Sequence, residues 1–410
     1  MPIISRVPID KVLISLICFI SIFGQSIFYL SGAAVFVKVS LLILSVMLGI
    51  ISLVLNFNKE NIKKSIFLIF LFIYIIIILW INLLKGSNGL VNYFYEYVFL
   101  LFLILYFSTN TLEKSGTSYL LQKIANLILA MATISLILWF CISILHLISP
   151  SNYVQLNWGT PHYIPSYFNL YFETQKITFG SLEFMRNTFI YPEAPIFSFY
   201  LSYALVVKVF LESKKIVSWE VLVLIATILS TGSSTGFIVI AAVILTRLII
   251  NLKSRIYRII ISVIVLCVFS IVVIFIFQQK MMNNSDSLNI RISDILIGFH
   301  TAFQHPLIGS GLNNYSAILN EMDIGRLMVN GNSGFSSGLA LIVAYTGLSL
   351  TIIYLIPILV GVFLGIKYNI GVFFFATTIL FLLVTTIVQE NYILLISLAY
   401  LLTLIYKKEI

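Results

Sequence analysis

Residues 65–84, SIFLIFLFIYIIIILWINLL, decide the class of fold, because they run for twenty positions without a charged side chain. A bilayer core of about 30 Å needs about 20 apolar residues in a helix, so this stretch predicts a transmembrane helix. The whole chain has the same character. Of its 410 residues, 60% are apolar and 10% are charged, against about 45–50% and about 25% in soluble domains. The composition therefore excludes a soluble enzyme, a disordered chain and a nucleic-acid-binding domain.

Twelve apolar segments of this kind follow one another along the chain. The fold class that they predict is an all-α, polytopic transmembrane helix bundle, with residues 1–410 as one integral membrane domain. The first segment lacks a small-residue cleavage site after a short apolar core, so we expect an uncleaved signal anchor. The predicted spans are residues 11–30, 33–55, 65–84, 92–107, 122–148, 189–211, 216–230, 237–250, 256–277, 337–363, 370–388 and 391–406.

The basic residues predict the orientation of these spans. With the N-terminus inside, 17 of the 24 Lys and Arg residues fall on the inner side and 7 on the outer side. Cytoplasmic loops carry the excess of Lys and Arg, so both termini are expected in the cytoplasm, and the net charge of +9 needs no nucleic-acid partner. Two long segments, 149–188 and 278–336, are then periplasmic loops, and loops of this length usually carry function.

The chain offers no signature of a metal or a cofactor site. Cys18, Cys141 and Cys267 each lie inside an apolar run, which suits small core residues and no disulfide framework. The four histidines have no metal-ligand spacing, and no phosphate-binding or dinucleotide-binding glycine loop occurs. We therefore predict no metal and no cofactor.

The first long loop is rich in Tyr, Phe, Asn and Pro, which suit sugar faces and hydroxyls as well as an interfacial aromatic belt. Arg186 is its one arginine; it either reaches lipid phosphate or grips a substrate phosphate with its planar fork. Glu193 stands between two prolines at a helix start. It either complements the helix N-terminus or acts as a base. The small polar segment 230–236 is either a tight outer turn or the floor of a site.

The second long loop contains an amphipathic helix, predicted from apolar residues at 292, 295, 296, 299 and 303 and ended by Pro306. Arg291 lies in its first turn, where a cation opposes the helix dipole. Pairing with Asp294 would offset that conflict; otherwise the conflict favours a functional role for Arg291. Arg326, in the irregular stretch 320–326, is either solvated or a third phosphate-binding arginine.

Two acidic residues lie close to the ends of spans. Glu96 is at the outer end of the fourth span, and Glu390 lies in the turn between the last two. An ionisable group at such a depth is a functional hypothesis by default. Glu390 therefore joins Glu193 as a candidate catalytic base.

These features together resemble the O-antigen polymerase and ligase superfamily over about residues 180–350. The resemblance rests on the Ser-Thr-Gly turn at 230–236, the arginine that opens an amphipathic helix, and the motif HPLIGSG at 305–311. It implies a glycosyltransferase of the bacterial inner membrane with a periplasmic active site, and a donor sugar chain on undecaprenyl diphosphate. By their motif positions, Arg186 and Arg291 match two loop arginines that hold the diphosphate.

The resemblance also separates two activities. In ligases of this superfamily a histidine late in the second loop assists the acceptor, and here no histidine follows His305. We therefore expect a polymerase of lipid-linked oligosaccharide repeat units, with a ligase as the alternative. A flippase or transporter is the alternative of another class. The implied partners are the undecaprenyl-diphosphate-linked oligosaccharide and the lipid bilayer; a chain-length regulator protein is left open.

Overall fold

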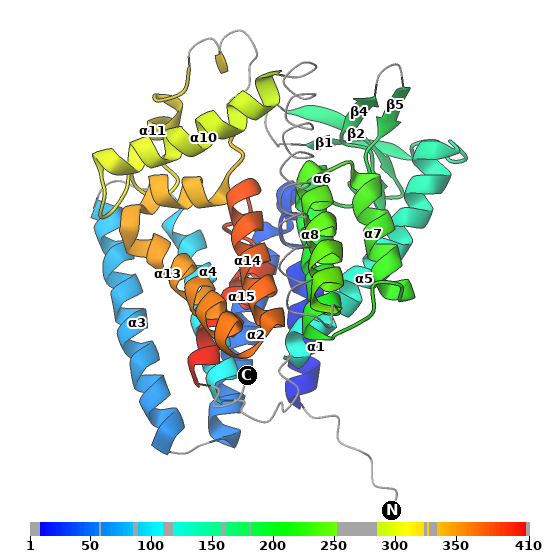
Figure 1. Ribbon diagram of the computed structural model, residues 1–410. Helices are drawn as coiled ribbons and strands as arrows, with labels where there is room; N and C mark the ends of the chain where they lie inside the picture. The colour runs from blue at the N-terminus through cyan, green and yellow to red at the C-terminus, as the bar shows by residue number, and fades with distance from the viewer. Residues whose placement is uncertain are drawn as a thin grey trace, which may run out of the picture.

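The computed structural model describes residues 9–56, 59–84, 89–109, 118–156, 161–179, 182–251, 285–323, 326–327 and 334–406. These residues form a helix bundle that is covered at one end by strands and by a long surface helix (Figure 1). The helices are α1 (Ile9–Ile22), α2 (Ala34–Leu55), α3 (Lys59–Leu84), α4 (Leu90–Thr109), α5 (Tyr119–Trp139), α6 (Ala194–Val206), α7 (Trp219–Thr231), α8 (Ser234–Asn251), α10 (Ser285–Gln304), α11 (Tyr315–Leu319), α13 (Gly338–Tyr368), α14 (Ile370–Thr385) and α15 (Tyr392–Thr403). Short irregular helical turns extend four of them: η1 (Tyr29–Ala33), η2 (Phe140–Ile144), η3 (Val207–Leu211) and η4 (Leu404–Tyr406).

The expectation of a helical membrane bundle is confirmed in its main feature. Within the described residues, six helices are long and apolar enough to cross a membrane, and four shorter apolar helices accompany them. Each predicted span overlaps a helix except 256–277, which lies outside the described residues. The count of twelve spans and their orientation stay predictions.

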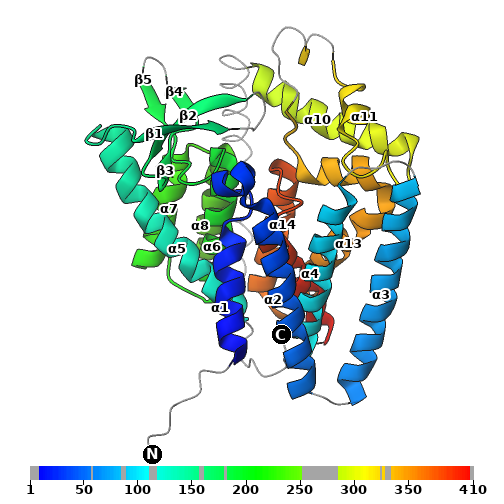
Figure 2. The same ribbon diagram turned by 180° about the vertical axis from the view of Figure 1, so that it is seen from behind.

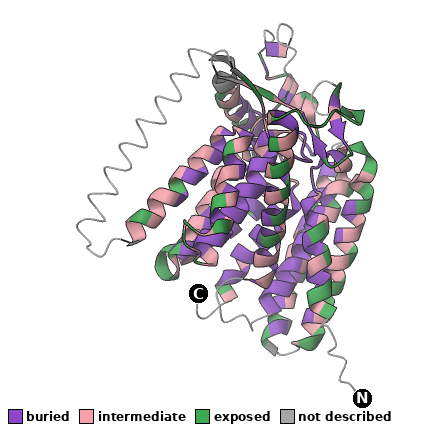
Figure 3. Cartoon of the chain, turned by 90° about the vertical axis from the view of Figure 1, so that its right-hand side faces the viewer, coloured by how far each residue is buried: buried purple, intermediate pink, exposed green. Residues whose placement is uncertain are grey.

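The helices differ in how far they face their surroundings. In the apolar window of α6, together with η3, 89% of the residues are buried, whereas in that of α3 the share is 28%. Figure 3 shows the buried residues gathered toward the middle of the bundle and exposed residues on its outer surfaces. Apolar residues cover α3 on most sides and remain exposed, among them Phe70 and Trp80. A helix that is apolar all round suits either lipid or a protein core. We conclude that α6 belongs to the centre of the bundle and that α3 offers its surface to lipid.

The bundle has two groups of helices. On one side, α5, α6, α7 and α8 pack together with α1; on the other, α4 packs against α2, α3 and α15, and α13 packs against α14 (Figures 1 and 2). The groups meet where α1 contacts α2 and where α14 contacts α6 and η3. The first residues of α1 and the last of η4 lie toward the end opposite the strands and α10.

The first long loop contains two small antiparallel sheets, which the expectation of an all-α fold did not include. One contains β1 (Asn152–Leu156), β2 (His162–Tyr167) and β3 (Tyr171–Phe172), and the other β4 (Lys176–Phe179) and β5 (Leu182–Met185). Val154 pairs with Ile164, and Ile164 is buried against the bundle. The strands lie above α5, α6 and α7 (Figure 1).

The predicted amphipathic helix is confirmed as α10, but its packed face is not the apolar stripe. Asp294, Ile297, Gly298 and Thr301 are buried, whereas Leu296 and Phe303 are among the exposed residues. A Cβ on Gly298 would lie 2.7 Å from Ala340 of α13, so the two helices touch closely. Small residues permit such close packing between membrane helices, and apolar residues can face lipid instead.

The HPLIGSG segment holds a break in α13, so the predicted span 337–363 is not one straight helix. Gly347 has φ 55° and ψ −146°, which are not helical values, and α13 is kinked at this residue. Ser310 and Gly311 donate backbone hydrogen bonds to the carbonyls of residues 344 and 345, and residues 348 and 349 donate back to residues 306 and 307. These four bonds, of 2.8–3.0 Å, satisfy groups that the broken helix leaves open. The motif is therefore a structural clasp between the loop and α13.

Candidate functional site

Arg186 lies directly after β5, against the C-terminal end of α7. Its Nε donates to the carbonyl of Thr231 at 2.8 Å, and one terminal nitrogen approaches the carbonyl of Gly232 at 3.4 Å. The other terminal nitrogen donates to Oε1 of Gln175 at 3.1 Å. These contacts use three of the five N–H donors of a guanidinium. The others find no acceptor in the part of the chain that the structure describes.

The segment 230–236 forms a turn between α7 and α8 that also supports Arg186; its role as the floor of a site stays a prediction. Gly232 ends α7 in the left-handed conformation (φ 58°), and α8 begins two residues later. Asn187, fully buried, donates its backbone N–H to the Ser230 carbonyl and its side chain to the Ser230 hydroxyl, both at 3.0 Å. The chain next to Arg186 is thus fixed through Asn187, and the Arg186 guanidinium is fixed through the carbonyls of Thr231 and Gly232.

Glu193 is the residue that precedes α6. Its backbone is extended (φ −142°, ψ 146°), and its carboxylate makes no capping bond to the helix in the described structure. Gln175 takes that place, because its Oε1 accepts from the N–H of Ala194 at 3.2 Å while also accepting from Arg186. The Glu193 carboxylate is therefore not committed to the end of α6.

Arg291, in α10, is held by the end of another helix. Its guanidinium donates to the carbonyl of Thr385, the last residue of α14, at 3.2 Å. Both arginines thus point at the carbonyl end of a bundle helix, where the partial negative charge of the helix dipole lies. Pairing of Arg291 with Asp294, one of the two interpretations from the sequence, is not the main contact of Arg291, because the Asp294 carboxylate accepts from Arg326.

Charge couples Arg186, Glu193 and Arg291, although they come from two different long loops and the start of α6. Burial lowers the pKa of Arg186 to about 10, while Glu193 raises it and Arg291 lowers it. Burial also lowers the pKa of Arg291, and Glu193 and Asp294 raise it. At neutral pH both guanidinium groups keep their charge. The two cations and the carboxylate therefore lie within electrostatic range of one another at the end of the bundle that carries the strands.

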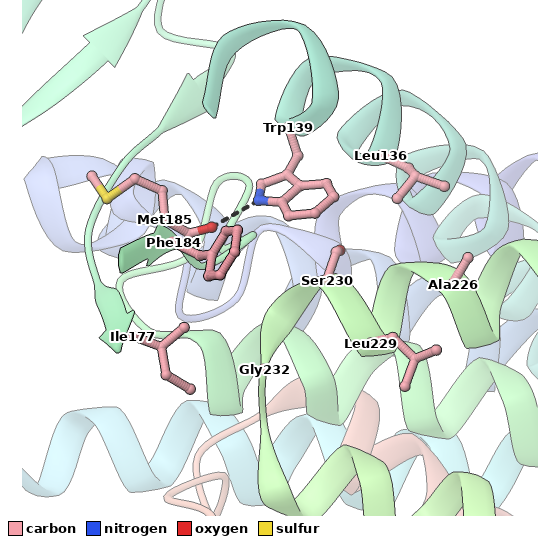
Figure 4. Close-up of a pocket in the computed structure, with 9 residues that line it drawn as sticks. All are labelled: Leu136, Trp139, Ile177, Phe184, Met185, Ala226, Leu229, Ser230 and Gly232. Carbon is pink, nitrogen blue, oxygen red and sulfur yellow. Dashed lines mark hydrogen bonds between the residues drawn. The ribbon is translucent and has the colours of Figure 1, made fainter. Parts of the chain in front are cut away.

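An apolar pocket of about 460 Å³ lies beside Arg186, between α5, α7 and the β4–β5 hairpin (Figure 4). Trp139 and Leu229 are on its walls, and Phe184 of β5 lies over it. The indole N–H of Trp139 donates to the carbonyl of Met185 at 2.8 Å, which fixes the hairpin next to Arg186. A Cβ on Gly232 would lie 3.8 Å from the Arg186 Nε, so the pocket leads to the guanidinium. Its size is within the range of small-molecule sites, about 300–1,000 Å³.

Arg326 is placed differently from the other two arginines. It is 8% exposed, so the expectation of a solvated side chain is wrong. One of its terminal nitrogens donates to Asp294 at 2.7 Å and another to the carbonyl of Gly334. The Ser336 hydroxyl donates to the second Asp294 oxygen at 2.6 Å. Arg326 thus joins the end of the second loop to α10; its role as a phosphate ligand stays a prediction.

Glu390 belongs to a second cluster of charges, with Glu96 and Lys38. Glu96 and Lys38 are buried in α4 and α2, and all three side chains lie within electrostatic range of one another. Burial raises the pKa of Glu390, while Lys38 and a hydrogen bond with Tyr93 lower it. Both carboxylate oxygens of Glu96 lack a hydrogen-bond partner among the described residues. The turn that holds Glu390 begins beside Thr385, the residue that binds Arg291.

The acidic and histidine side chains of the described residues do not form a group with the arrangement of metal ligands. In the described ranges, no group of three His, Cys, Asp or Glu side chains could hold an ion. His300 pairs with Glu321 instead, at 2.9 Å between Nδ1 and Oε2.

A comparison with protein families adds an independent observation. A family model described as O-Antigen ligase matches residues 220–334. Over this segment the chain is therefore similar to the O-antigen polymerase and ligase superfamily. It covers just over a quarter of the chain, including Arg291 and the HPLIGSG clasp, whereas Arg186 and Glu193 lie before it. No curated protein sequence matches the chain. Together with the apolar helices, the match supports a multi-pass membrane enzyme of O-antigen-type biosynthesis in general terms.

Two residues that support the site were not predicted from the sequence: Gln175 and Asn187. Gln175 and Asn187 lie in the first long loop, and a sequence gives no sign of which distant carbonyl or helix end a side chain will meet. Their bonds to Arg186, Ser230 and Ala194 became visible once the strands were in place.

Proposed function

We propose that this protein polymerises lipid-linked oligosaccharide repeat units into O-antigen or a similar surface polysaccharide. The observation that carries the proposal is the meeting of Arg186 and Arg291 with Glu193, beside an apolar pocket. The donor in this proposal is a sugar chain on undecaprenyl diphosphate, and the reaction takes place on the periplasmic side of the bacterial inner membrane.

The site offers complementary surfaces for the two parts of such a donor. A diphosphate has enough oxygens to accept bonds from two guanidinium forks. The pocket next to Arg186 is lined mainly by apolar side chains from α5, α7 and the hairpin, and Leu229 on its wall is 52% exposed. We assign the first isoprenoid units of the carrier to this pocket, with the diphosphate at Arg186.

The chemistry follows from the charges. An acceptor hydroxyl oxygen attacks the anomeric carbon of the donor sugar and forms the new glycosidic bond. The bond from that carbon to the phosphate oxygen breaks, and undecaprenyl diphosphate leaves with the electron pair. Negative charge grows on the leaving oxygen, and fixed arginines in a water-poor site stabilise it. Since the arginines are oriented by helix ends before substrate arrives, little reorganisation is needed.

A base must take the proton of the acceptor hydroxyl, and two carboxylates are candidates. Glu193 lies within electrostatic range of both arginines, which makes it the candidate nearest to the bound diphosphate in this proposal. Glu390 has a pKa raised by burial, which makes it a stronger proton acceptor once ionised. Replacing each by glutamine decides between them, because only loss of the base removes the acidic limb of the pH–rate profile.

The region where the resemblance implies a ligase histidine has other residues here. Ser336 donates to Asp294, and the Ser337 hydroxyl accepts from the N–H of Ala340 at the start of α13. Both side chains therefore serve the structure of α10 and α13. This supports a polymerase, with the ligase as the second candidate.

The deciding experiment uses a strain in which the gene is deleted. Loss of a polymerase leaves lipopolysaccharide capped by a single repeat unit and no ladder. Loss of a ligase leaves none capped, and polymer collects on undecaprenyl diphosphate. Loss of a flippase leaves single lipid-linked units on the cytoplasmic face. Either of the last two results would overturn the polymerase proposal.

A reconstituted assay tests the remaining parts of the proposal. Purified protein in lipid should extend lipid-linked repeat units without any other protein, and a chelator should leave the rate unchanged. Activity that disappears with chelator and returns with one divalent ion would contradict metal independence. A chain-length regulator added to the assay should change the length distribution but not the need for the two arginines.

A further inference from the structure

We propose that the outer face of the β1–β2–β3 sheet is a binding platform for the polysaccharide chain. The identity of the ligand as a sugar chain rests on the proposed function; the existence of the platform rests on the strands. Antiparallel partners lie on the same face of a sheet. Tyr153 pairs with Pro165 and Gln155 with Tyr163, so these four side chains share one face.

This face is exposed, unlike its reverse. Tyr153 is 65% exposed and Tyr163 is 70% exposed, whereas Leu156 and Ile164 on the other face are each 2% exposed. Tyr153 and Tyr163 are diagonal neighbours across the two strands, about 7–8 Å apart by ordinary sheet geometry. The sheet therefore displays two tyrosine rings and an amide side by side, away from the bundle.

The turn between β2 and β3 adds a third exposed ring at the end of the same sheet. Phe168 and Asn169 both have positive φ, 53° and 55°, and Leu170 N–H donates to the Tyr167 carbonyl at 3.0 Å. A left-handed phenylalanine is unfavourable, and burial does not offset the strain because Phe168 is 69% exposed. Ser151 accepts from the Phe168 N–H at 2.8 Å, and Ser166 donates to Asn169 at 3.0 Å. The turn is thus held in a conformation that leaves the ring outside.

The chemistry of this surface suits carbohydrate better than phospholipid headgroups. Residues 152–156 and 161–172 contain no Lys, Arg, Asp or Glu. Without basic side chains, the sheet has no charge attraction for anionic lipids. Sugars present apolar C–H faces that pack on aromatic rings, and hydroxyls that exchange hydrogen bonds with amides. Tyr153 and Tyr163 supply rings and Gln155 an amide.

The platform is continuous with the candidate site. The N–H of Phe172 in β3 donates to the carbonyl of Phe189 at 3.0 Å, and the Thr188 hydroxyl donates to the Phe172 carbonyl at 3.0 Å. Residues 188 and 189 lie between Arg186 and Glu193 in the chain. A sugar chain on a diphosphate at Arg186 would therefore find the sheet rigidly placed beside its attachment point.

The test is direct binding by the full-length protein in lipid nanodiscs. The probe is the polysaccharide of the source strain, released from its lipid by mild acid. Tyr153→Ala combined with Tyr163→Ala should weaken binding at least tenfold, whereas Tyr153→Phe combined with Tyr163→Phe, which keeps the rings, should change it less than threefold. Phe363→Ala is the matched control, since Phe363 on α13 is 72% exposed but far along the chain from the sheet. Equal binding by the double alanine variant and wild type would overturn the platform.

A second measurement separates sugar binding from membrane contact. Tyr153→Trp places a reporter on the face, and its fluorescence should respond to the polysaccharide but not to brominated lipids. Quenching by brominated lipid without a response to polysaccharide would mean an interfacial belt and would refute the proposal. In cells, the double alanine variant should shorten the ladder while single repeats are still joined. If the protein proves not to be a polymerase, the length of the ladder no longer reports on the platform, and the binding result still decides it.

Discussion

Replacing Arg186 by alanine is expected to lower the rate of polymer formation by a large factor. Its guanidinium is fixed at 2.8 Å from the Thr231 carbonyl and at 3.1 Å from Gln175, with donors left over for a ligand. Truncating one partner of a buried, hydrogen-bonded charge pair costs about 2–5 kcal/mol. At about 1.4 kcal/mol per tenfold, kcat/KM should fall by about 30- to 5,000-fold.

The same reasoning gives the pattern across related variants. Arg291→Ala should cost a similar factor, and the double variant should cost less than the product, because both groups act on one diphosphate. Arg186→Lys should recover little, since an ammonium group cannot form the fork. Without substrate, Arg186→Ala should lower the melting temperature, because its three bonds and the attraction to Glu193 are lost and the relief of repulsion from Arg291 is the smaller effect.

The assay is the conversion of purified lipid-linked repeat units by protein in nanodiscs, with products separated as a ladder. Arg247→Ala is the control, because Arg247 on α8 contacts Ser213 near the opposite end of the α7–α8 pair. Normal membrane insertion is checked for each variant. Full-length ladders from both Arg186→Ala and Arg291→Ala at the wild-type rate would refute the diphosphate role.

Three further outcomes are expected. Arg326→Ala should destabilise the fold by about 3–5 kcal/mol, because it leaves Asp294 without its basic partner. If Arg326 is structural, adding Asp294→Asn should restore both the melting temperature and the activity. If the double variant is stable but inactive, Arg326 has a role as a ligand. Because burial raises the pKa of Glu390, its ionised form is disfavoured in the fold. Stability should therefore fall as pH rises from below 4.5 through the higher folded pKa, and Glu390→Gln should flatten this dependence in a melting series. Gly347→Ala should lower the yield of folded protein and its melting temperature. The new Cβ would lie 2.6 Å from the Pro306 carbonyl oxygen, and the backbone at residue 347 has a conformation that suits glycine. An unchanged melting curve would contradict a structural role for the clasp.

The helices were predictable because lipid forces a simple rule on the sequence. Long uncharged runs such as 65–84 must satisfy their backbone groups internally, and the helix does so. The α10 helix was equally clear from its periodicity. Its orientation was not, because the rule that apolar residues face inward fails where lipid is the surroundings. On α10 the residues that pack are small or polar, as Gly298 against Ala340 illustrates.

The strands were missed although one signal for them was present. Residues 176–179 and 182–185 are short runs separated by Gly180 and Ser181, a spacing typical of a two-residue hairpin. The aromatic and proline content of the loop suits irregular structure as well as strands, so it does not reinforce this signal. Arg186 directly follows β5, and its contact with Thr231 depends on how the hairpin sits over α7.

The partners of Arg326 could not be read from the chain for a simple physical reason. The bond to Asp294 joins residues 32 positions apart, across the end of α10 and the clasp. An isolated arginine among polar residues is usually solvated, and only the packing of α10 on α13 closes the space around it. The sequence indicates that Glu390 lies close to the ends of two spans. It does not indicate that Glu96 and Lys38 are its neighbours, because they come from helices distant in the sequence.

The two arginines are attached to different groups of helices, and this has a mechanical consequence. Arg186 is fixed to the end of α7, and Arg291 to the end of α14 and, through α10, to α13. Their separation therefore changes whenever α6 and η3 slide along α14. A diphosphate that bridges them would join the two groups across this contact and restrict their relative movement. Bound substrate should then raise the melting temperature of the whole bundle, and a change in bilayer thickness that shifts one group should alter affinity without touching either arginine.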